Sequence, residues 1–359
     1  MGSLLDRMRD LRNRVIAKPE FQRWAASFPL SRPMVRKRTS ETFNMAVGFS
    51  YAQVLRACVE LDVFETLRDG PLPLADFAAR IDLPEEGADR LARAAVALSL
   101  LERRRDGYAL GLYGAALLGN PAVFPMIKHH GALYADLCDP VALLRQRTHD
   151  TALARFWNYD EGGSSPYSAL MATTQAFISA EILSAFSFKG FEHVMDVAGG
   201  AGAFLCALKE KRPEMKATLC DLENVAPIAR QNFADKGIDV RVAARNIHDD
   251  ALPVGADIIT LIRVLHDHDD ERVHALLKSV HSALPAGGTV LVAEPMAKTR
   301  GAEPMGDAYF GLYLWAMGSG RPRSKRELSA FLCAAGFRRP REVKTNNPIL
   351  TRILVAERD

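Results

Sequence analysis

The chain has 359 residues, of which 25% are charged and 48% hydrophobic, and its formal net charge is +3 at pH 7. This length allows two domains with a substantial core, and we expect no secretory signal, no membrane span and no bound metal. Five cysteines without a C-x-x-C pair argue against a disulfide framework or a zinc site and are typical of a cytoplasmic protein.

The first 40 residues are predicted to form a basic N-terminal arm. Residues 1–38 contain ten Lys or Arg and three acidic residues, a net charge of +7, so the rest of the chain carries −4. Apolar side chains lie between these cations, namely Phe21, Trp24, Phe28, Leu30 and Met34. Two interpretations stay open: an arm that is solvated or packed against a partner, and a peripheral contact with an anionic membrane surface.

Residues 41–113 are predicted to form an all-α, winged-helix-like domain. Helices are expected over residues 47–67, 74–81 and 85–101, followed by a hairpin with its turn at Asp106-Gly107. Such modules bind DNA, and the arginines at 103–105 suit phosphate contacts. The candidate recognition helix, however, offers one Arg and one Asp to base edges. We therefore predict a homodimerisation domain without nucleic-acid binding, and keep a DNA-binding, ligand-sensing regulator as an alternative.

Residues 114–190 are predicted to be a helical linker rich in His, Met and aromatic side chains. Large apolar side chains at helical spacing are usually core residues. Because this segment has to lie between the dimerisation domain and the sheet domain, we also expect part of it to line a pocket for an apolar substrate. The candidates are Met126, His130, Trp157, Met171 and Phe177.

A strand, a glycine-rich turn and a helix at residues 194–209 begin the catalytic half, residues 191–359. Glycine lets the backbone turn tightly and approach a ligand at the carboxyl edge of a parallel sheet. A dinucleotide fingerprint needs a small residue where Leu205 stands, which disfavours a nicotinamide oxidoreductase. The acid before the turn suits a ligand with a cationic amino-acid part, such as S-adenosylmethionine. The predicted cofactor contacts here are Asp196, Ala198, Gly199, Gly200 and Gly202.

Asp221 ends the next predicted strand, residues 217–221. It stands 19 residues after Gly202, close to the spacing at which an acid binds ribose hydroxyls in doubly wound sheets. Alone, an Asp at such a place is more often a helix cap. Beside the glycine turn, ribose binding is the better interpretation.

The remaining elements alternate between strands and helices. Strands are predicted at residues 240–243, 257–262, 289–293, 341–344 and 349–355, with helices at 272–283 and 325–335. Alternation that closes with two adjacent strands predicts an α/β fold. We expect a seven-stranded, Rossmann-like, mostly parallel sheet with an antiparallel strand at its end.

Polar side chains follow two strand ends in this half. His266 comes directly after the apolar run 258–265, and Glu294 ends the next strand. Because these ends face one crevice, the carboxylate can fix the tautomer of the imidazole and favour its protonated form. We predict His266 as a general base and Glu294 as its partner. Asp269, Asp270 and Glu271 are explained as acids at a helix N-terminus.

These segments resemble a known family. Residues 196–202, Asp221-Leu222, residues 265–271 and residues 335–337 are similar to the plant-type and acetylserotonin-type S-adenosylmethionine O-methyltransferases. Within this family, the chain resembles the bacterial demethylspheroidene (hydroxyneurosporene) O-methyltransferases of phototrophs at three segments, namely Glu294-Pro295-Met296 and residues 307–310 and 316–323. The likeness covers nearly the whole chain. It implies the seven-stranded methyltransferase fold preceded by a winged-helix-like dimerisation domain.

The resemblance also implies an activity. The reaction would be methylation of the tertiary 1-hydroxyl of an acyclic carotenoid with S-adenosylmethionine as cofactor; a phenolic or polyketide hydroxyl is the alternative acceptor. It adds cofactor contacts at Leu222, Asn246, Ile247 and Arg263. It adds pocket residues at Tyr309, Tyr313 and Met317.

The chain departs from the family pattern at five positions. The first loop glycine is Ala198, and the Gly-Asp that meets adenine aligns with Arg245-Asn246. A lysine before the catalytic histidine is Ile262, and the tryptophan after it is His268. The second catalytic glutamate aligns near Pro322, which leaves Glu294 as the acid beside the base.

The implied mechanism assigns proton removal to the histidine. An isolated tertiary alcohol is too weak an acid to ionise beforehand, so His266 would remove its proton as the methyl group moves. The imidazole has to be neutral to do so. We therefore expect the rate to fall below a pH of roughly 6.5, unless Glu294 shifts that point.

Overall fold

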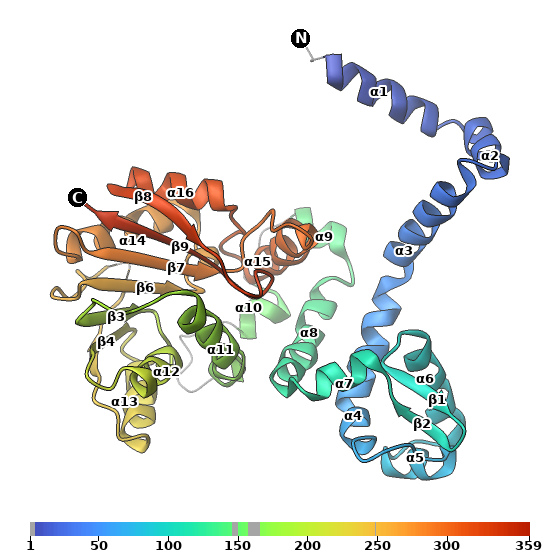
Figure 1. The fold of residues 1–359 in the computed structure, drawn as a ribbon, viewed down its shortest axis with the longest axis horizontal. Helices are drawn as coiled ribbons and strands as arrows, with labels where there is room; N and C mark the ends of the chain where they lie inside the picture. The colour runs from blue at the N-terminus through green and yellow to red at the C-terminus, as the bar shows by residue number, and fades with distance from the viewer. Residues whose placement is uncertain (1–3, 146–149, 157–165, 248) are drawn as a thin grey trace. The chain divides into compact units, whose positions relative to one another are not determined.

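The structure is a computed structural model that describes residues 4–145, 150–156, 166–247 and 249–359, with side chains of the third range described from residue 174 (Figure 1). The chain forms two compact units, residues 1–121 and 122–359. The four-part division expected from the sequence is finer than these two units and stays a prediction.

The first unit consists of helices and one small hairpin. Its elements are α1 (Leu4–Ile16), α2 (Pro19–Ser27), α3 (Arg32–Glu60), α4 (Val63–Thr66), α5 (Leu74–Arg80), α6 (Glu85–Ala97), β1 (Leu101–Arg104), β2 (Gly107–Leu110) and α7 (Leu112–Leu118). The single helix predicted over 47–67 is wrong, because it is the end of α3 followed by the short α4. Asp62, whose φ is 50°, lies in the left-handed region between them and interrupts the helix.

The hairpin turn lies one residue earlier than predicted. Arg104 pairs with Gly107, so Arg105 and Asp106 form the turn. Gly107 has a φ of 136°, and a Cβ there would come within 1.9 Å of the Leu72 carbonyl oxygen. The glycine is therefore required by the close approach of Leu72, which forms a bridge to Tyr108, and not by the turn itself.

The second unit is a seven-stranded sheet with helices on both faces. The strands are β3 (His193–Val197), β4 (Lys216–Asp221), β5 (Arg241–Ala244), β6 (Ile258–Ile262), β7 (Thr289–Glu294), β8 (Phe337–Val343) and β9 (Arg352–Arg358). The helices are α8 (Phe124–Asp136), α9 (Pro140–Arg145), α10 (Ala152–Phe156), α11 (Pro166–Ala185), α12 (Ala203–Lys211), α13 (Ala226–Asp235), α14 (Asp270–Ala283), α15 (Gly311–Met317) and α16 (Lys325–Ala334). Three single turns are η1 (Pro121–Val123), η2 (Leu265–Asp267) and the π-helical η3 (Met305–Phe310).

The strand order is β5-β4-β3-β6-β7-β9-β8, and the five strands from β3 to β7 run parallel to one another. This confirms the predicted mostly parallel α/β sheet. The antiparallel strand is β9, which pairs with β7 on one side and β8 on the other. The expectation of an antiparallel strand at the end of the sheet is therefore wrong, because β9 folds back between β7 and the edge strand β8 (Figure 1).

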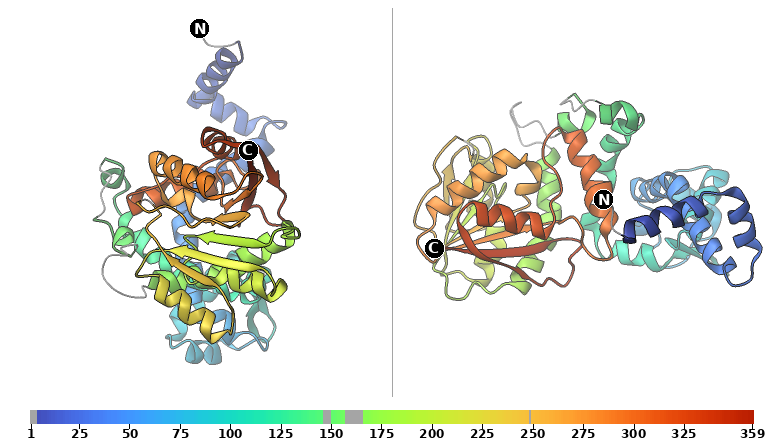
Figure 2. Two further views of the ribbon diagram at one scale, coloured as in Figure 1. Left: turned by 90° about the vertical axis from the view of Figure 1, so that its left-hand side faces the viewer. Right: turned by 90° about the horizontal axis from the view of Figure 1, so that it is seen from above.

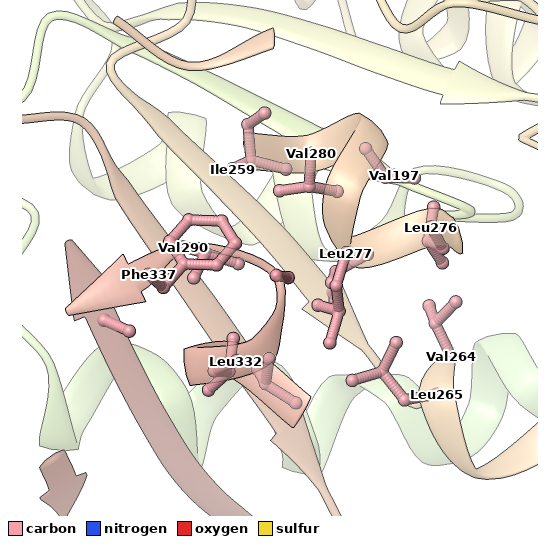
Figure 3. Close-up of a cluster of buried hydrophobic side chains, with 14 of the residues drawn as sticks. Val197, Ile259, Val264, Leu265, Leu276, Leu277, Val280, Val290, Leu332 and Phe337 are labelled. Carbon is pink, nitrogen blue, oxygen red and sulfur yellow. The ribbon is translucent and has the colours of Figure 1, made fainter. Parts of the chain in front are cut away.

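Alternating side chains of each central strand enter two separate cores. On one face, Ile259 and Val290 pack against α14 and α16, including Leu277 and Leu332 (Figure 3). On the other face, their strand neighbours pack against α11, α12 and α13. Figure 2 shows the sheet between these layers. Because each fully buried Leu or Ile contributes about 1.5–3 kcal/mol, the two cores hold the strands rigidly in register.

The parallel strands place their carboxyl ends along one edge of the sheet. β3 and β4 end at this edge beside the glycine turn, and β6 and β7 end there beside His266 and Glu294. In open α/β sheets, ligands bind outside the carboxyl ends of the strands. No helix among the described ranges is both long enough and apolar enough to cross a bilayer.

Candidate active site

The glycine turn after β3 is supported from inside by a buried carboxylate. Asp196 is 1% exposed, and its Oδ1 accepts a hydrogen bond of 2.6 Å from the Thr260 hydroxyl on β6. Burial, reinforced by the charge of Asp221 and opposed by the Thr260 hydrogen bond, raises the pKa of Asp196 to about 7. A Cβ at Gly199 would lie 2.3 Å from Asp196 Oδ2, so only glycine lets the turn rest on this carboxylate.

Three residues of the turn have left-handed backbone conformations. Their φ values are 56° at Ala198, 58° at Gly200 and 76° at Gly202. Gly202 is the N-cap of α12, and a Cβ there would meet the Phe233 ring at 2.2 Å. Ala198 is the one residue of the three with a Cβ, and its conformation costs about 1–2 kcal/mol. This explains in physical terms why the family pattern has glycine at that position.

Asp221 lies where β4 ends, beside the glycine turn. Its Oδ2 accepts a hydrogen bond of 2.7 Å from Gly200 N–H, and its Oδ1 accepts one of 2.7 Å from Leu222 N–H. Burial raises the pKa of Asp221 to about 6, although both N–H groups oppose the shift. At neutral pH the group is mainly ionised and offers its remaining lone pairs at the sheet edge.

Two predicted cofactor contacts follow β5. Arg245 N–H donates to the Asp221 carbonyl oxygen at 2.8 Å and holds this segment beside β4. Asn246 N–H donates to Asp250 at 2.8 Å, and its side-chain amide donates to Asp249 at 2.5 Å. Ile247 is buried in the core. The Asn246 amide nitrogen is thus engaged within its own loop.

Arg263 follows β6 in a left-handed conformation with a φ of 58°. Its N–H donates to the Ala293 carbonyl oxygen at 2.8 Å, and its Nη1 donates to the Thr174 hydroxyl of α11 at 3.0 Å. The residue therefore connects the end of β6 to β7 and to the helix that covers this edge.

His266 lies in η2 between two carboxylates. Glu294 Oε2 is 3.4 Å from Nδ1 and accepts a hydrogen bond of 3.1 Å from the His266 backbone N–H. Asp267 Oδ1 is 3.1 Å from Nε2. His266 is 5% exposed and Glu294 is fully buried. The structure therefore brings together the two predicted catalytic residues and adds Asp267.

Burial and the neighbouring carboxylates have opposite effects on the pKa of His266. Burial lowers it, but the charge of Asp267, whose Oδ1 lies 3.1 Å from Nε2, followed by the hydrogen bond and charge of Glu294, outweighs burial and raises the pKa to about 9. In the structure as described, the imidazole is mainly protonated at neutral pH. This places the turning point well above the 6.5 of an unperturbed imidazole.

Sequence reasoning missed Asp267 because it begins a run of acids that was explained by helix capping. The three acids from Asp269 to Glu271 do lie at the N-terminus of α14, but the side chain of Asp269, the N-cap residue, makes no cap hydrogen bond. Its Oδ1 accepts instead from Gly320 N–H at 3.1 Å. Asp270 pairs with Arg321 and Arg323. The sequence signal for Asp267 was its direct adjacency to the histidine.

A cluster of rings from α8, η3 and α15 reaches His266 through Phe310. Phe310, in the π-helical η3, has its ring centroid 5.9 Å from that of His266. His130 Nε2 is 2.7 Å from the Tyr309 hydroxyl, and His129 Nε2 is 2.8 Å from the Tyr313 hydroxyl. Burial lowers the pKa of both histidines, that of His129 to about 4, and raises the pKa of Tyr309 to about 12. These paired groups are uncharged at neutral pH.

The other predicted pocket residues have different surroundings. Met317 is buried in an apolar cluster with Tyr313, whereas Met126 on α8 is partly exposed and Phe177 on α11 is 39% exposed. Trp157 lies outside the described residues. Met171 belongs to α11, but its side chain is also outside the described part of the chain.

Comparison with known proteins gives two family matches. Residues 134–338 match an O-methyltransferase domain, and residues 43–120 match an O-methyltransferase dimerisation domain. These two ranges lie in the sheet-containing half and in the helical first unit, respectively.

Individual relatives extend this likeness to most of the chain. The demethylspheroidene O-methyltransferase of Cereibacter sphaeroides is 40% identical over 335 residues, which is 90% of this chain and 88% of that protein. The protein of the same name from Rhodobacter capsulatus is 38% identical, with 92% and 85% covered. The crystal structure of human N-acetylserotonin methyltransferase with SAM has a TM-score of 0.75 and 25% identity, covering 89% of this chain and 97% of that one.

Proposed function

Because the chain belongs to the S-adenosylmethionine-dependent O-methyltransferases, we propose that it methylates the tertiary 1-hydroxyl of an acyclic carotenoid, with His266 as general base. The protein is an O-methyltransferase, and S-adenosylmethionine is its cofactor. The observation that supports the carotenoid substrate is likeness over nine-tenths of the chain to two demethylspheroidene O-methyltransferases. A phenolic or polyketide acceptor, or a DNA-binding regulator, is not favoured.

The residues at the β3 and β4 ends fit this cofactor. The turn from Ala198 to Gly202 leaves backbone close to the sheet edge, since Gly199 and Gly202 have no room for a Cβ. Asp221 is ionised at neutral pH and can accept hydrogen bonds from ribose hydroxyls. Asp196 acts from beneath, by supporting the turn. Leu222, Asn246, Ile247 and Arg263 complete the proposed cofactor contacts.

The chemistry divides simply between cofactor and protein. S-adenosylmethionine supplies an electrophilic methyl group, so the protein mainly has to orient the acceptor oxygen and remove its proton. In neutral His266, a proton on Nδ1 faces Glu294, which leaves the Nε2 lone pair as the proton acceptor. The Asp267 carboxylate, which lies 3.1 Å from Nε2, has to move aside so that the acceptor hydroxyl can reach this nitrogen. Its carboxylate then stabilises the imidazolium that forms.

The rings beside His266 support an apolar substrate. The polar atoms of Tyr309 and His130 satisfy each other, as do those of Tyr313 and His129. Uncharged, internally paired groups present ring surface to a ligand without leaving buried donors unsatisfied. We include Met126, Phe177 and Met317 in the proposed pocket for the polyene.

The first unit carries the features that bear on the homodimer and on contact with a membrane. The matched dimerisation domain supports a homodimer. We also propose that the arm, residues 1–38, contacts an anionic membrane in which the polyene resides. Apolar side chains on α1 are exposed between its arginines, among them Leu4 at 76% and Leu11 at 59%.

A mass-spectrometric methyl-transfer assay tests the activity. Purified protein, S-adenosylmethionine and a detergent-dispersed 1-hydroxycarotenoid are compared with a panel of simple phenols. We expect a methyl ether on the carotenoid alone. Methylation of the phenols alone would contradict the polyene substrate and leave the reaction class intact.

A further inference from the structure

Residues 319–323 donate hydrogen bonds to the backbone carbonyl groups on both sides of His266 and at His266 itself. Four consecutive carbonyl oxygens, from Leu265 to His268, each accept a hydrogen bond from this segment. The donors, in that order, are Arg323 Nη1 (2.7 Å), Arg321 N–H (3.0 Å), Ser319 Oγ (2.8 Å) and Arg323 Nη2 (2.7 Å). The short η2 turn that holds the histidine is therefore fixed from outside itself.

Arg323 is the centre of this contact. Its side chain is fully buried, and Asp270 Oδ1 lies 2.6 Å from Nη2 and 3.0 Å from Nε. A buried guanidinium is costly unless its charge is paired and its donors are satisfied. Here a carboxylate and two carbonyl oxygens meet both needs. The planar fork of arginine suits this geometry, which the single point charge of lysine cannot reproduce.

The same residue connects the two chain segments that carry the proposed catalytic pair. Its own carbonyl oxygen accepts a hydrogen bond of 3.0 Å from Ala297 N–H, three residues after Glu294. Its side chain holds the carbonyl groups on either side of His266. Arg323 therefore couples the position of the His266 ring to that of the Glu294 carboxylate.

Gly320 shows how closely the segment approaches. Its φ is 80°, and a Cβ there would lie 2.1 Å from the His266 carbonyl oxygen and 2.6 Å from the Asp267 carbonyl carbon. Only glycine permits this backbone-to-backbone approach. The close approach of Gly320 and the buried side chain of Arg323 show independently that residues 319–323 hold the η2 backbone in place.

We propose that Arg323 is a positioning residue that holds the His266 ring between Asp267 and Glu294. The proposal rests on the proposed role of His266 as the base. Arg323 acts through the η2 backbone and does not touch the reacting atoms.

The test compares Arg323→Gln, Arg323→Lys and a matched control, Arg358→Lys. Arg358 also donates to two backbone carbonyl groups, those of Ser282 and Leu284, at the other end of α14. We expect Arg323→Gln to lower kcat by about 10–100-fold on the alkaline plateau, where His266 is neutral in both proteins, as displacement of a catalytic group does, with the affinity for S-adenosylmethionine retained. Arg323→Lys should recover part of this loss, and the control should keep the wild-type rate.

The titration of His266 followed by NMR gives a readout that a general loss of stability would not move. In Arg323→Gln the imidazole should titrate closer to 6.5, since its carboxylate neighbours are no longer held against it. If that variant does not fold, Ser319→Ala, which removes one neutral hydrogen bond to the Asp267 carbonyl, should shift the titration in the same direction by less. An unchanged titration in whichever variant folds overturns the proposal.

Different results would refute the general-base role of His266 and the positioning role of Arg323. If His266→Ala keeps wild-type turnover, the general base is wrong, whereas the NMR result on Arg323 still decides the positioning role. If Arg323→Gln lowers kcat without moving the His266 titration, the loss has another cause and the positioning role is refuted.

Discussion

At the scale of single residues, His266 is the most constrained side chain of the site. We expect His266→Ala to lose turnover by about 10²–10⁴-fold, because the substitution removes the proposed proton acceptor. Binding of S-adenosylmethionine should persist, since the glycine turn and Asp221 are built on β3 and β4. Turnover assays and calorimetric titration measure the two properties. Wild-type-like turnover would contradict the assignment.

The carboxylates beside His266 determine its pH dependence. The free enzyme should gain kcat/KM as pH rises toward about 9, where the imidazole loses its proton. Asp267→Asn and Glu294→Gln each remove one charge, so each should move the midpoint of the pH–rate profile downward. A profile that keeps its midpoint in both variants would show that His266 does not control the rate.

The same shift affects stability, and its sign can be stated. The pKa of His266 is higher in the folded protein than the ordinary 6.5, so protonation favours the folded state. This stabilisation is complete below about 6.5 and is lost as pH rises through about 9. Folding therefore favours the protonated imidazolium over the neutral imidazole, which is the reactive form of His266.

Ala198 offers a test of backbone strain. Relief of the left-handed conformation in Ala198→Gly, about 1–2 kcal/mol, exceeds or matches the entropic cost of glycine, about 0.5–1 kcal/mol. We expect unchanged stability or a gain of up to about 1 kcal/mol in urea unfolding. The control is Ala201→Gly, at a turn residue without positive φ, which should lose stability. Equal losses in both variants would contradict the strain argument.

At the scale of elements, the core beneath η2 keeps the strand ends in place. Leu277 of α14 is fully buried against the sheet, and its neighbour Lys278 is exposed (Figure 3). Leu277→Ala should lower the free energy of unfolding by about 2–5 kcal/mol. Lys278→Ala should change it by about 0.5 kcal/mol or less. Denaturant unfolding of both measures the difference, and similar losses would place Leu277 outside the core.

The strand–helix pattern and the glycine turn were predictable because they depend on local sequence. Period-2 and period-3.6 patterns predict the alternation that becomes β3 to β7, and the turn after β3 is fixed by Gly199, Gly200 and Gly202. The order of β8 and β9 in the sheet was not predictable, because the sequence of either strand is compatible with the edge position and with the position next to β7. The break at Asp62 was missed because the apolar pattern continues on both sides of it, although aspartate is a common helix N-cap and visits the left-handed region more readily than most residues.

The His266–Glu294 pair was predictable from topology, since parallel strand ends meet at one edge. The role of segment 319–323 was not, because its contacts join residues more than 50 positions apart in the chain. Asp269 and Asp270 look like helix-terminal acids in sequence. Their carboxylates are used instead by Gly320 and Arg323, which only the tertiary structure reveals.

At the scale of the whole molecule, charge is unevenly distributed. The arm holds a net +7 and the remainder −4, and α1 has an apolar face made by Leu4, Leu5, Met8 and Leu11. The full chain should float with phosphatidylglycerol vesicles in a salt-sensitive manner, and the chain lacking residues 1–38 should not. Vesicle flotation measures this.

Two point variants separate the membrane from the partner subunit as the surface that α1 contacts. Leu11→Glu places a charge on the apolar face, and Asn13→Glu places the same charge about 200° away around the helix. Only Leu11→Glu should lose vesicle binding. If it instead breaks the dimer in light scattering while flotation is unchanged, the arm contacts the partner and the membrane proposal is wrong.

The place of β9 in the sheet has a consequence for biosynthesis. The strand that ends in Glu294 pairs with β6 on one side, but its other partner, β9, is made only when residues 352–358 are translated. At ordinary elongation rates this interval lasts several seconds. Once β7 has left the ribosome and until β9 pairs with it, this strand edge is open, and open edges attract other strands. Yield in the cell should thus depend on ribosome-associated chaperones that shield this edge until β9 closes it.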